Sequence, residues 1–444
     1  MLVKVSHIIH AQKESISNAP LVVFRLAFGL MMIGSVIRFA LNGWIETMYI
    51  QPKFHFAYYG FEWIQKPSPE WIYVLFGLIL LGAIGITLGA LYRISTVIFF
   101  LTFTYVELID KTYYLNHYYF VSLVAFLLIW LPAHRRFSLD VLLFPKIATN
   151  QCRRFELSVI RMQVGILYVY AGLAKINSDW LLRAMPLRIW LAANGHLPII
   201  GTLLTKTWVA FLFSWFGMIY DVTIPFFLSL KKTRAFAYLS VIVFHMLTAL
   251  LFPIGVFPFV MIMSALIFFP IQTHERWLSK MEQTFQFPAL QSQTRSTQSF
   301  TQWLFASFVI FQLVFPWRYL LYPDNLFWHE QGYRFSWRVM LMEKVGMANF
   351  KVIDEKRRTL EIDNMDFLTP LQEKMMATQP DMILQFAHYL EQGFKKEGMS
   401  DPKVFVDAYA TLNGRSTRRF IDPEVDLSEI KDSWTHKQWI LSYE

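Results

Sequence analysis

Charged residues are scarce in this chain of 444 residues: Asp, Glu, Lys and Arg together make up 16 %, against 55 % apolar residues. An ordinary soluble domain has about 25 % charged residues, so this composition argues against one. Several apolar runs instead reach the roughly 20 residues that cross the hydrocarbon core of a bilayer. The sequence therefore predicts a polytopic membrane protein with a mainly α-helical fold.

Cysteine is almost missing too, which limits the covalent and metal chemistry of the chain. Cys152 is the only cysteine, so an intrachain disulfide cannot form. Metal sites built on several thiolates are excluded for the same reason, and the HExxH, Walker and GxSxG patterns are absent. The net charge of +9 comes with no nucleic-acid-binding motif. We therefore expect neither a metal ion nor a nucleic acid as a partner.

Apolar segments long enough to span the membrane recur along the chain. The first of them lacks the small-residue cleavage site of a signal peptide, so we expect it to stay in the bilayer. The segment 197–204 is too short to cross and is expected to be re-entrant or interfacial. Nine spans are predicted, near 20–41, 71–91, 93–110, 117–132, 156–175, 207–230, 234–252, 254–270 and 301–321.

The distribution of Lys and Arg predicts the orientation. If the N-terminus is cytoplasmic, the inner loops carry about twice as many of these residues as the outer loops. An odd number of spans then places the C-terminal region outside. We predict a transmembrane helical domain over 1–325 and an extracytoplasmic, β-rich domain with a helix over 326–444.

The C-terminal region has the patterns of a folded polar domain. Alternation in 349–354 and 359–363, separated by a charged turn, predicts a hairpin. The segment 380–398 has the periodicity of an amphipathic helix. A strand is predicted over 403–414, ending in an Asn-Gly turn, and 286–299 is expected to be a polar linker before the last span.

Polar side chains at membrane depth are costly and often functional. The segment ELIDKTYYLNHYYF (107–120) places Asp110, Lys111, Asn116 and His117 at one depth near the outer surface. A polar hairpin wetted by lipid headgroups would also account for them, so the segment alone leaves both interpretations open.

Lys175 ends an apolar run in YAGLAKINSDW (170–180). It lies about 28 Å along a helix that begins near Glu156, at the same outer level as His117. Such a lysine can simply extend to the headgroups, with Trp180 as an interfacial anchor. The alternative is that a site requires its amine.

His245, in VIVFHMLTALLFPIGVFP, matches Lys175 and His117 in depth. A lone histidine there is more often a hydrogen-bonding core residue than a catalyst. Asp221 and Arg161 lie deeper, and we expect them to form a buried pair, because each would be costly without a partner.

Four blocks carry a family resemblance: LIDKTYYLNHYYF, RMQVGILYVYAGLAKINSDW, FHMLTALLFPIGVFPFVM and NGRSTRRFIDPEVD. In this order they resemble vitamin K-dependent γ-glutamyl carboxylase and its bacterial relatives with an HTTM domain. The resemblance implies an integral membrane enzyme that oxidises vitamin K hydroquinone, or menaquinol, with O2 to the epoxide. The strong base so generated removes a γ-proton from a peptide glutamate, and the carbanion captures CO2.

The resemblance also implies roles for single residues. Lys175 corresponds to the catalytic base and His117 to its assisting histidine. A hydroquinone is a weak acid whose oxygenation needs the oxyanion, and desolvation at an apolar helix end favours the free amine of a lysine. Cofactor-binding positions are Asn116, His245, Asp110 and Lys111.

The glutamate-binding part of the family is only partly matched. GYRFSWRVM (332–340) retains Tyr333 and Trp337, but the double-arginine segment corresponds to 371–382, where Lys374 is the only nearby cation. Lysine does not replace arginine in bidentate carboxylate binding. The single cysteine also removes the family's disulfide. Quinol oxygenation is therefore better supported by the sequence than protein carboxylation.

Three functions follow from these patterns. The first is carboxylation of a Glu-containing exported protein, with the active site on the extracytoplasmic side of a bacterial inner membrane. The second is quinol epoxidation or oxidation without carboxylation. The third is a non-catalytic transporter or assembly factor, which would distribute its polar groups along a path through the bilayer.

Overall fold

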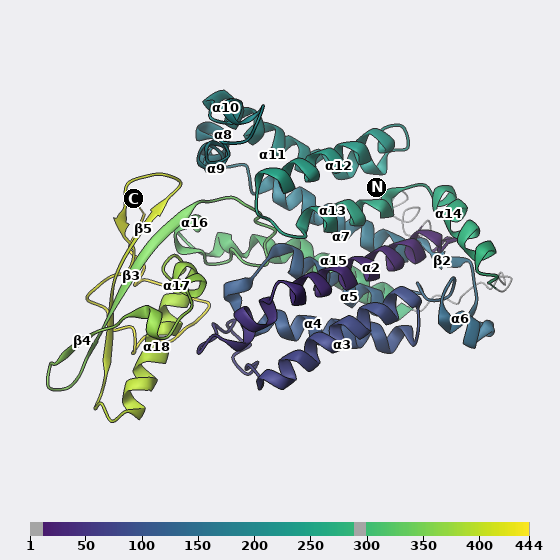
Figure 1. The fold of residues 1–444 in the computed structure, drawn as a ribbon. Coiled ribbons are helices and arrows are strands. Elements are labelled where there is room, and N and C mark those ends of the chain that lie inside the picture. The colour runs from purple at the N-terminus through teal and green to yellow at the C-terminus, as the bar shows by residue number, and fades with distance from the viewer. Residues whose placement is uncertain (1–11, 288–298, 444) are drawn as a thin grey trace.

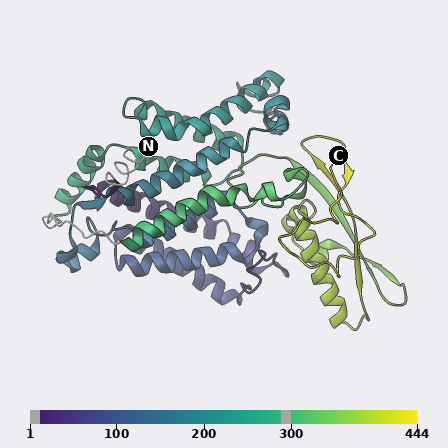
Figure 2. The same ribbon diagram turned by 180° about the vertical axis from the view of Figure 1, so that it is seen from behind.

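The computed structural model describes residues 12–287 and 299–443. Apolar helices form a bundle, and the chain then leaves it to build a small sheet domain beside one end (Figure 1). The helix α15 runs along the opposite side of the bundle toward that domain (Figure 2). The long bundle helices are α2 (Ala19–Leu41), α3 (Pro69–Leu88), α4 (Tyr92–Ile109), α5 (Asn116–Trp130), α7 (Arg154–Leu173), α11 (Thr207–Ser229), α12 (Arg234–Leu251), α13 (Phe257–Ala265) and α15 (Ser299–Val314).

Six helices among the described residues are long and apolar enough to cross a membrane: α2, α3, α4, α11, α12 and α15 with the turn that follows it. A seventh span results if α13 and α14 (Ile271–Thr284) are one broken span, bent by 103°. Pro270 directly precedes α14 and lacks the N–H that a continuous helix needs. The mainly helical, membrane-spanning fold is confirmed.

The predicted segments 117–132 and 156–175 are helical but weaker as spans. The helix α5 has only 15 residues, and α7 carries Glu156 and Arg161, which lower its hydropathy. The count of nine spans therefore stays a prediction. The segment 197–204 contains only the four-residue helix α10 (Gly201–Leu204), which agrees with its being too short to cross.

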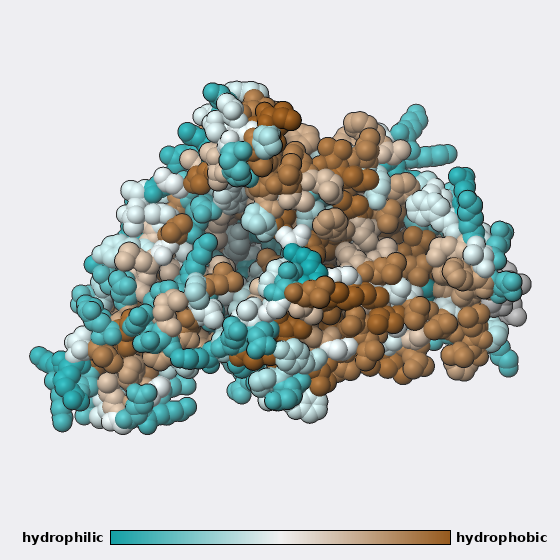
Figure 3. Space-filling view, in the orientation of Figure 1, coloured by the Kyte–Doolittle hydropathy of each residue, from teal (hydrophilic) through white to brown (hydrophobic). Residues whose placement is uncertain are grey.

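Apolar side chains cover the outside of the bundle, as expected for a surface in contact with lipid. Phe236, Leu81 and Trp303 are 78 %, 64 % and 75 % exposed. The sheet domain is predominantly hydrophilic on the face seen in Figure 3. The surface of the bundle thus suits contact with lipid, and the surface of the sheet domain suits contact with water.

The C-terminal domain, meaning the sheet with α17 (Pro370–Met376) and α18 (Pro380–Lys396), has strand order β4-β3-β5-β6, and all pairs are antiparallel. The side chains of α18 pack on the sheet, and the Phe386 ring lies 5.0 Å from that of Phe350. The predicted hairpin, helix and strand are confirmed. The strands are β3 (Lys344–Ile353), β4 (Thr359–Glu361), β5 (Lys403–Leu412) and β6 (Arg418–Arg419).

Hydrogen bonds fix this domain to the outer loops of the bundle. Gln372 Nε2 donates to the Phe54 carbonyl at 2.7 Å and to Asp110 Oδ2 at 3.0 Å. Gln385 Nε2 donates to the Ala57 carbonyl at 2.8 Å. The domain is therefore held against the end of the bundle at which Asp110 lies.

Candidate functional site

Lys175 is positioned by a close crossing of α7 and α11. A Cβ on Gly172 would lie 2.7 Å from the backbone N of Val222 and 3.1 Å from Cβ of Asp221, so the crossing requires glycine. Lys175 follows Gly172 by one turn, and its Nζ donates to Asp221 Oδ2 at 2.7 Å and to the Ala171 carbonyl at 3.0 Å. Both charged side chains are 9 % exposed. The lysine thus turns inward onto a carboxylate.

The predicted Arg161–Asp221 pair is wrong. Arg161 donates through Nε to the Ile267 carbonyl at 2.9 Å, and Asp221 is paired with Lys175. Arg161 precedes Lys175 by 14 residues, about 21 Å along a helix. It therefore lies too far along the bundle to reach a carboxylate that contacts Lys175.

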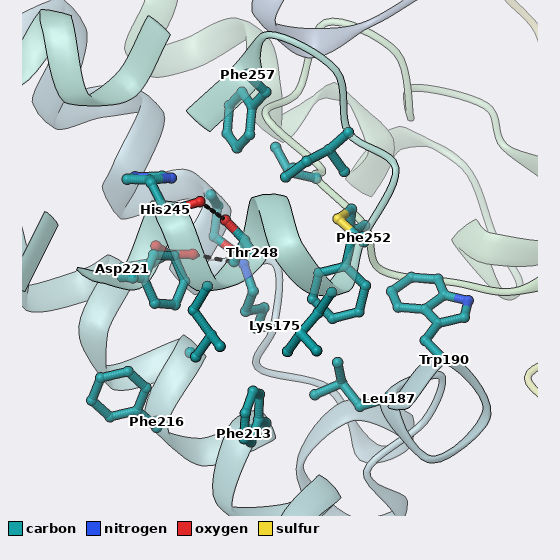
Figure 4. Close-up of a pocket in the computed structure, with 18 of the residues that line it drawn as sticks. Lys175, Leu187, Trp190, Phe213, Phe216, Asp221, His245, Thr248, Phe252 and Phe257 are labelled. Carbon is teal, nitrogen blue, oxygen red and sulfur yellow. Dashed lines mark hydrogen bonds and ion pairs between the residues drawn. The ribbon is translucent and has the colours of Figure 1, made fainter. Parts of the chain in front are cut away.

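An apolar cavity of about 270 Å³, here called the Lys175 cavity, opens beside this ion pair (Figure 4). His245 also lines it, and His245 Nε2 lies 2.8 Å from the Tyr168 hydroxyl, while Nδ1 is buried without a hydrogen-bond partner. Lys175 and His245 thus meet in one cavity, as their depth in the sequence suggested. Its aromatic walls are Tyr168, Trp180, Trp190, Phe213, Phe216, Phe244, Phe252 and Phe257.

Trp180 belongs to this wall and is buried inside the protein. It is 3 % exposed, its Nε1 donates to the Ser214 carbonyl at 2.9 Å, and its ring centroid lies 5.5 Å from Lys175 Nζ. A cation over an indole face is stabilised by the ring quadrupole. The tryptophan thus holds Lys175 from a second side.

His117 and Asn116 lie near the cavity but do not line it. The Phe257 ring is 5.8 Å from the ring of His117 and 5.8 Å from that of His245, so one phenyl group contacts both imidazoles. Asn116 Nδ2 donates to the Arg338 carbonyl at 2.9 Å. Asn116 therefore connects the start of α5 to the segment that follows α15.

Asp110 and Lys111, predicted to bind the cofactor, lie away from the Lys175 cavity. Asp110 Oδ2 lies 3.0 Å from His55 Nδ1 and accepts from Gln372. Lys111 Nζ pairs with Asp381 at 2.7 Å, and Arg334 pairs with the same carboxylate at 2.8 Å. Their contacts join the two parts of the protein.

These contacts perturb the pKa of Asp381. Burial alone would raise the pKa of this carboxyl, but the charges of Arg334 and Lys111 hold it well below its usual range. Burial lowers the pKa of Lys111, and Asp381 counteracts this. The fold therefore keeps Asp381 ionised.

The residues predicted for glutamate binding have different surroundings. Trp337 is fully buried and stacks on Tyr119 with ring centroids 4.9 Å apart. The ring centroids of Tyr333 and Phe327 are 6.3 Å apart, and Lys374 is exposed on α17. The structure does not bring these three side chains together.

The expectation that Lys374 is the only cation near 371–382 is wrong. Arg334 and Lys111 both bind Asp381, and Arg334 also donates to Gln379. Arg334 precedes its partner Gln379 by 45 residues, and Lys111 lies far earlier still in the chain, so no local pattern in 371–382 indicates either cation.

A second, more polar cavity of about 270 Å³, here called the Arg338 cavity, lies at the end of α7. Arg338 is 8 % exposed and lies 4.2 Å over the Tyr319 ring. Its Nε is buried without a hydrogen-bond partner, and among the described residues no carboxylate pairs with it. Arg415, on the same cavity, is paired with Asp179. Arg338 therefore offers a cation for an anionic ligand.

Residues 336–340, here called the dividing segment, separate the two cavities. Ser336 and Arg338 line the Arg338 cavity, whereas Val339 and Met340 line the Lys175 cavity. Sequence reasoning missed both Arg338 and Asp221 as site residues. Within the described ranges, no group of three or more His, Cys, Asp or Glu side chains is arranged to hold a metal ion.

Comparison with known families matches nearly the whole chain. Residues 13–273 match the HTTM domain, and residues 297–444 match the lumenal domain of vitamin K-dependent gamma-carboxylase. No solved structure matches the chain. The lumenal match and the apolar helices together indicate an integral membrane protein with an extracytoplasmic C-terminal domain. The chain therefore belongs to the vitamin K-dependent γ-carboxylase family.

Proposed function

We propose that the protein is a vitamin K-type hydroquinone-dependent carboxylase of glutamyl residues, with Lys175 as the base that initiates the reaction. The observation that carries this proposal is the inward-facing Lys175, paired with Asp221 in an apolar, aromatic-walled cavity. A prenylated quinol fits such a cavity in chemical character, since its ring can pack on aromatic side chains and its hydroxyl can bind the amine. When bound, a hydroquinone supplies on reaction with O2 the strong base that carboxylation requires.

The protein's own groups would handle the first proton. A lysine that is fully protonated cannot accept one. Its Nζ donates to Asp221 Oδ2 at 2.7 Å, so a proton can pass along this hydrogen bond to the carboxylate. The amine would act as base when that proton resides on Asp221.

His245 and His117 would complete the site. His245 lines the cavity, is fixed by the Tyr168 hydroxyl, and has no hydrogen-bond partner for Nδ1 among the described residues. His245 would bind the second hydroxyl group of the quinol ring. His117, in contact with Phe257, would act from behind that phenyl group. The apolar walls would exclude water, which protects a strong base from quenching.

The glutamyl side chain would enter from the Arg338 cavity. Its carboxylate would bind the Arg338 guanidinium, which has no carboxylate partner in the described part of the chain and can form a bidentate pair. Because Val339 and Met340 face the Lys175 cavity, a side chain held at Arg338 would be separated from the quinol by the dividing segment alone. Tyr333, which packs against the cavity-lining Phe327, and Trp337 of the dividing segment would border this acceptor region.

Epoxide formation tests the first half of the proposal. The protein in lipid nanodiscs receives vitamin K hydroquinone or menaquinol with O2, and epoxide is followed by chromatography. We expect epoxide from the wild type and none above background from Lys175→Ala. Lys206→Ala removes an exposed lysine and serves as the matched control. Lack of epoxide from wild-type protein with every quinol would contradict the proposal and favour a non-catalytic membrane role.

Incorporation of labelled bicarbonate into a Glu-containing peptide tests the second half. Arg338→Gln should raise the KM for the peptide and leave epoxide formation in place, and Arg338→Lys should restore part of the affinity. Arg188→Gln, at an exposed arginine, is the control. Epoxide without any incorporated label would identify a quinol epoxidase that does not carboxylate, the alternative favoured by the absence of an arginine pair in 371–382.

A further inference from the structure

A third cavity, of about 680 Å³, lies where the bundle meets the C-terminal domain, and we call it the interfacial cavity. Phenylalanines of α4, α5 and α15 line one part: Phe100, Phe126, Phe308 and Phe311. Charged side chains of the outer segments line the other part, including Lys111, Arg334 and Lys437. An apolar section that continues into a charged section suits an amphiphile. Neither catalytic cavity shares a lining residue with it.

Most charges in the interfacial cavity are already neutralised. Asp381 pairs with Lys111 and Arg334, and Asp432 pairs with Lys437. Glu330, on the same wall, pairs with Lys344 at 3.0 Å. These groups need no ligand.

Two charged groups on its wall lack an ion-pair partner among the described residues. Glu107 lies on α4, a candidate span, and within residues 12–287 and 299–443 neither an ion pair nor a hydrogen bond involves its carboxylate. One turn earlier, Thr104 Oγ1 is buried without a hydrogen-bond partner. A carboxylate at membrane depth without a partner is costly. A ligand that brings an N–H cation would satisfy both groups.

Arg318 is the complementary group. Its guanidinium donates to the Phe315 carbonyl at 3.1 Å, to the Ser336 hydroxyl at 3.0 Å and to the Arg334 carbonyl, all uncharged acceptors. Its Nε is buried without a partner. Guanidinium groups bind phosphate well. The same cavity therefore offers one site for a cation and one for an anion.

We propose that the interfacial cavity binds a phospholipid with a primary ammonium group, of the phosphatidylethanolamine class. The ammonium binds Glu107 and Thr104, the phosphate binds Arg318, and the acyl chains follow the phenylalanines of α4, α5 and α15. An anionic lipid without an amine leaves Glu107 unpaired. A quaternary amine cannot donate hydrogen bonds to Glu107 or Thr104. The proposal is independent of the catalytic activity.

Lipid retention measured by native mass spectrometry tests this assignment. Full-length protein, delipidated in detergent, is titrated with phosphatidylethanolamine, its N-methyl and N,N-dimethyl derivatives, phosphatidylcholine and phosphatidylglycerol. We expect wild-type affinity to fall with each methylation, by about tenfold from the primary to the quaternary amine, the size of a charge-assisted hydrogen bond. Equal affinity across this series would overturn the proposal without any variant.

Variants then locate the site. Glu107→Gln should lower the affinity for phosphatidylethanolamine to that for phosphatidylcholine, and Arg318→Gln should weaken binding of every phospholipid. Glu46→Gln, at an exposed carboxylate outside the cavity, should change nothing. A preference for the primary amine that survives Glu107→Gln would refute the site. Binding of phosphatidylglycerol as tight as that of phosphatidylethanolamine would refute the ligand class.

Discussion

Substitution of Asp221 by Asn removes one charge from the Lys175 pair and nearly preserves its volume. At 2.7 Å and an effective dielectric constant of about 20, Coulomb's law gives an attraction of about 6 kcal/mol, an upper bound. Removal of one partner from a buried pair costs about 3–5 kcal/mol in practice. The variant should therefore lose about 3 kcal/mol of folding stability, because the buried Lys175 is left without its carboxylate.

The consequence for catalysis is the loss of a proton acceptor beside the amine. In the wild type, Lys175 Nζ donates to the Asp221 carboxylate at 2.7 Å, and the proton that leaves the amine can pass to that carboxylate. The amide in Asp221→Asn can accept a hydrogen bond but cannot take up this proton. Epoxide formation should therefore fall by about 100-fold or more, the lower end of what general acid–base catalysis contributes.

Initial rates of epoxide formation at saturating quinol measure this loss, and circular dichroism shows whether the variant is folded. Asp401→Asn, at an exposed aspartate, is the control and should retain the wild-type rate. Asp221→Glu keeps a carboxylate and should retain more of the rate than Asp221→Asn. A folded Asp221→Asn variant with the wild-type rate would refute the inference that Asp221 takes up the proton from Lys175.

Three further perturbations test other parts of the structure. Gly172→Ala should cost about 1–3 kcal/mol of stability by overpacking and should lower epoxide formation. Gly165→Ala is the control on the same helix: a Cβ there meets its nearest atom at 3.7 Å, so neither stability nor epoxide formation should change. Equal melting temperatures of the two variants would contradict this reasoning. Asp381→Asn leaves two buried cations without their carboxylate, which should lower the stability of the protein by about 3–5 kcal/mol. Limited proteolysis should then cleave the C-terminal domain more readily. Glu391→Gln, in a solvated pair, is the control and should lower the stability by under about 1 kcal/mol. Burial lowers the pKa of His329 to about 4, so only the unfolded state binds this proton as the pH falls below about 6.5. Stability should fall by about 2 kcal/mol from pH 6.5 to pH 5, measured by thermal melting, and His329→Gln should lose this part of the pH dependence; a variant as acid-sensitive as the wild type would refute the assignment.

Local patterns predicted much of the fold. Alternating side chains in 403–412 and the amphipathic periodicity of 380–396 indicate a strand and a helix, since burial on one face depends only on sequence spacing. All nine predicted spans are helical in the structure. The depth of a residue in the membrane also depends only on its position along its helix. The sequence could therefore predict that Lys175 and His245 lie at the same depth.

Contacts that depend on how helices cross could not be read from the sequence. Asp221 lies 46 residues from Lys175, and their pairing depends on the approach that Gly172 permits. Depth alone wrongly paired Asp221 with Arg161. Likewise, the sequence around residue 338 does not indicate that the Arg338 guanidinium lacks a carboxylate partner. This lack arises because the fold pairs the nearby carboxylates with other cations.

The dividing segment is synthesised after the helices that form the rest of the Lys175 cavity. Residues 336–340 come late in the chain, yet Val339 and Met340 form part of the wall of a cavity built mainly by α7, α11 and α12. A ribosome completes those helices before the segment exists, so the nascent bundle holds Lys175 in an open-sided cavity. The wall closes only after the C-terminal region has crossed the membrane and folded. Under the proposed reaction, a partly translocated chain would lack an enclosed site for a strong base, and the order of assembly would prevent premature oxidation of quinol.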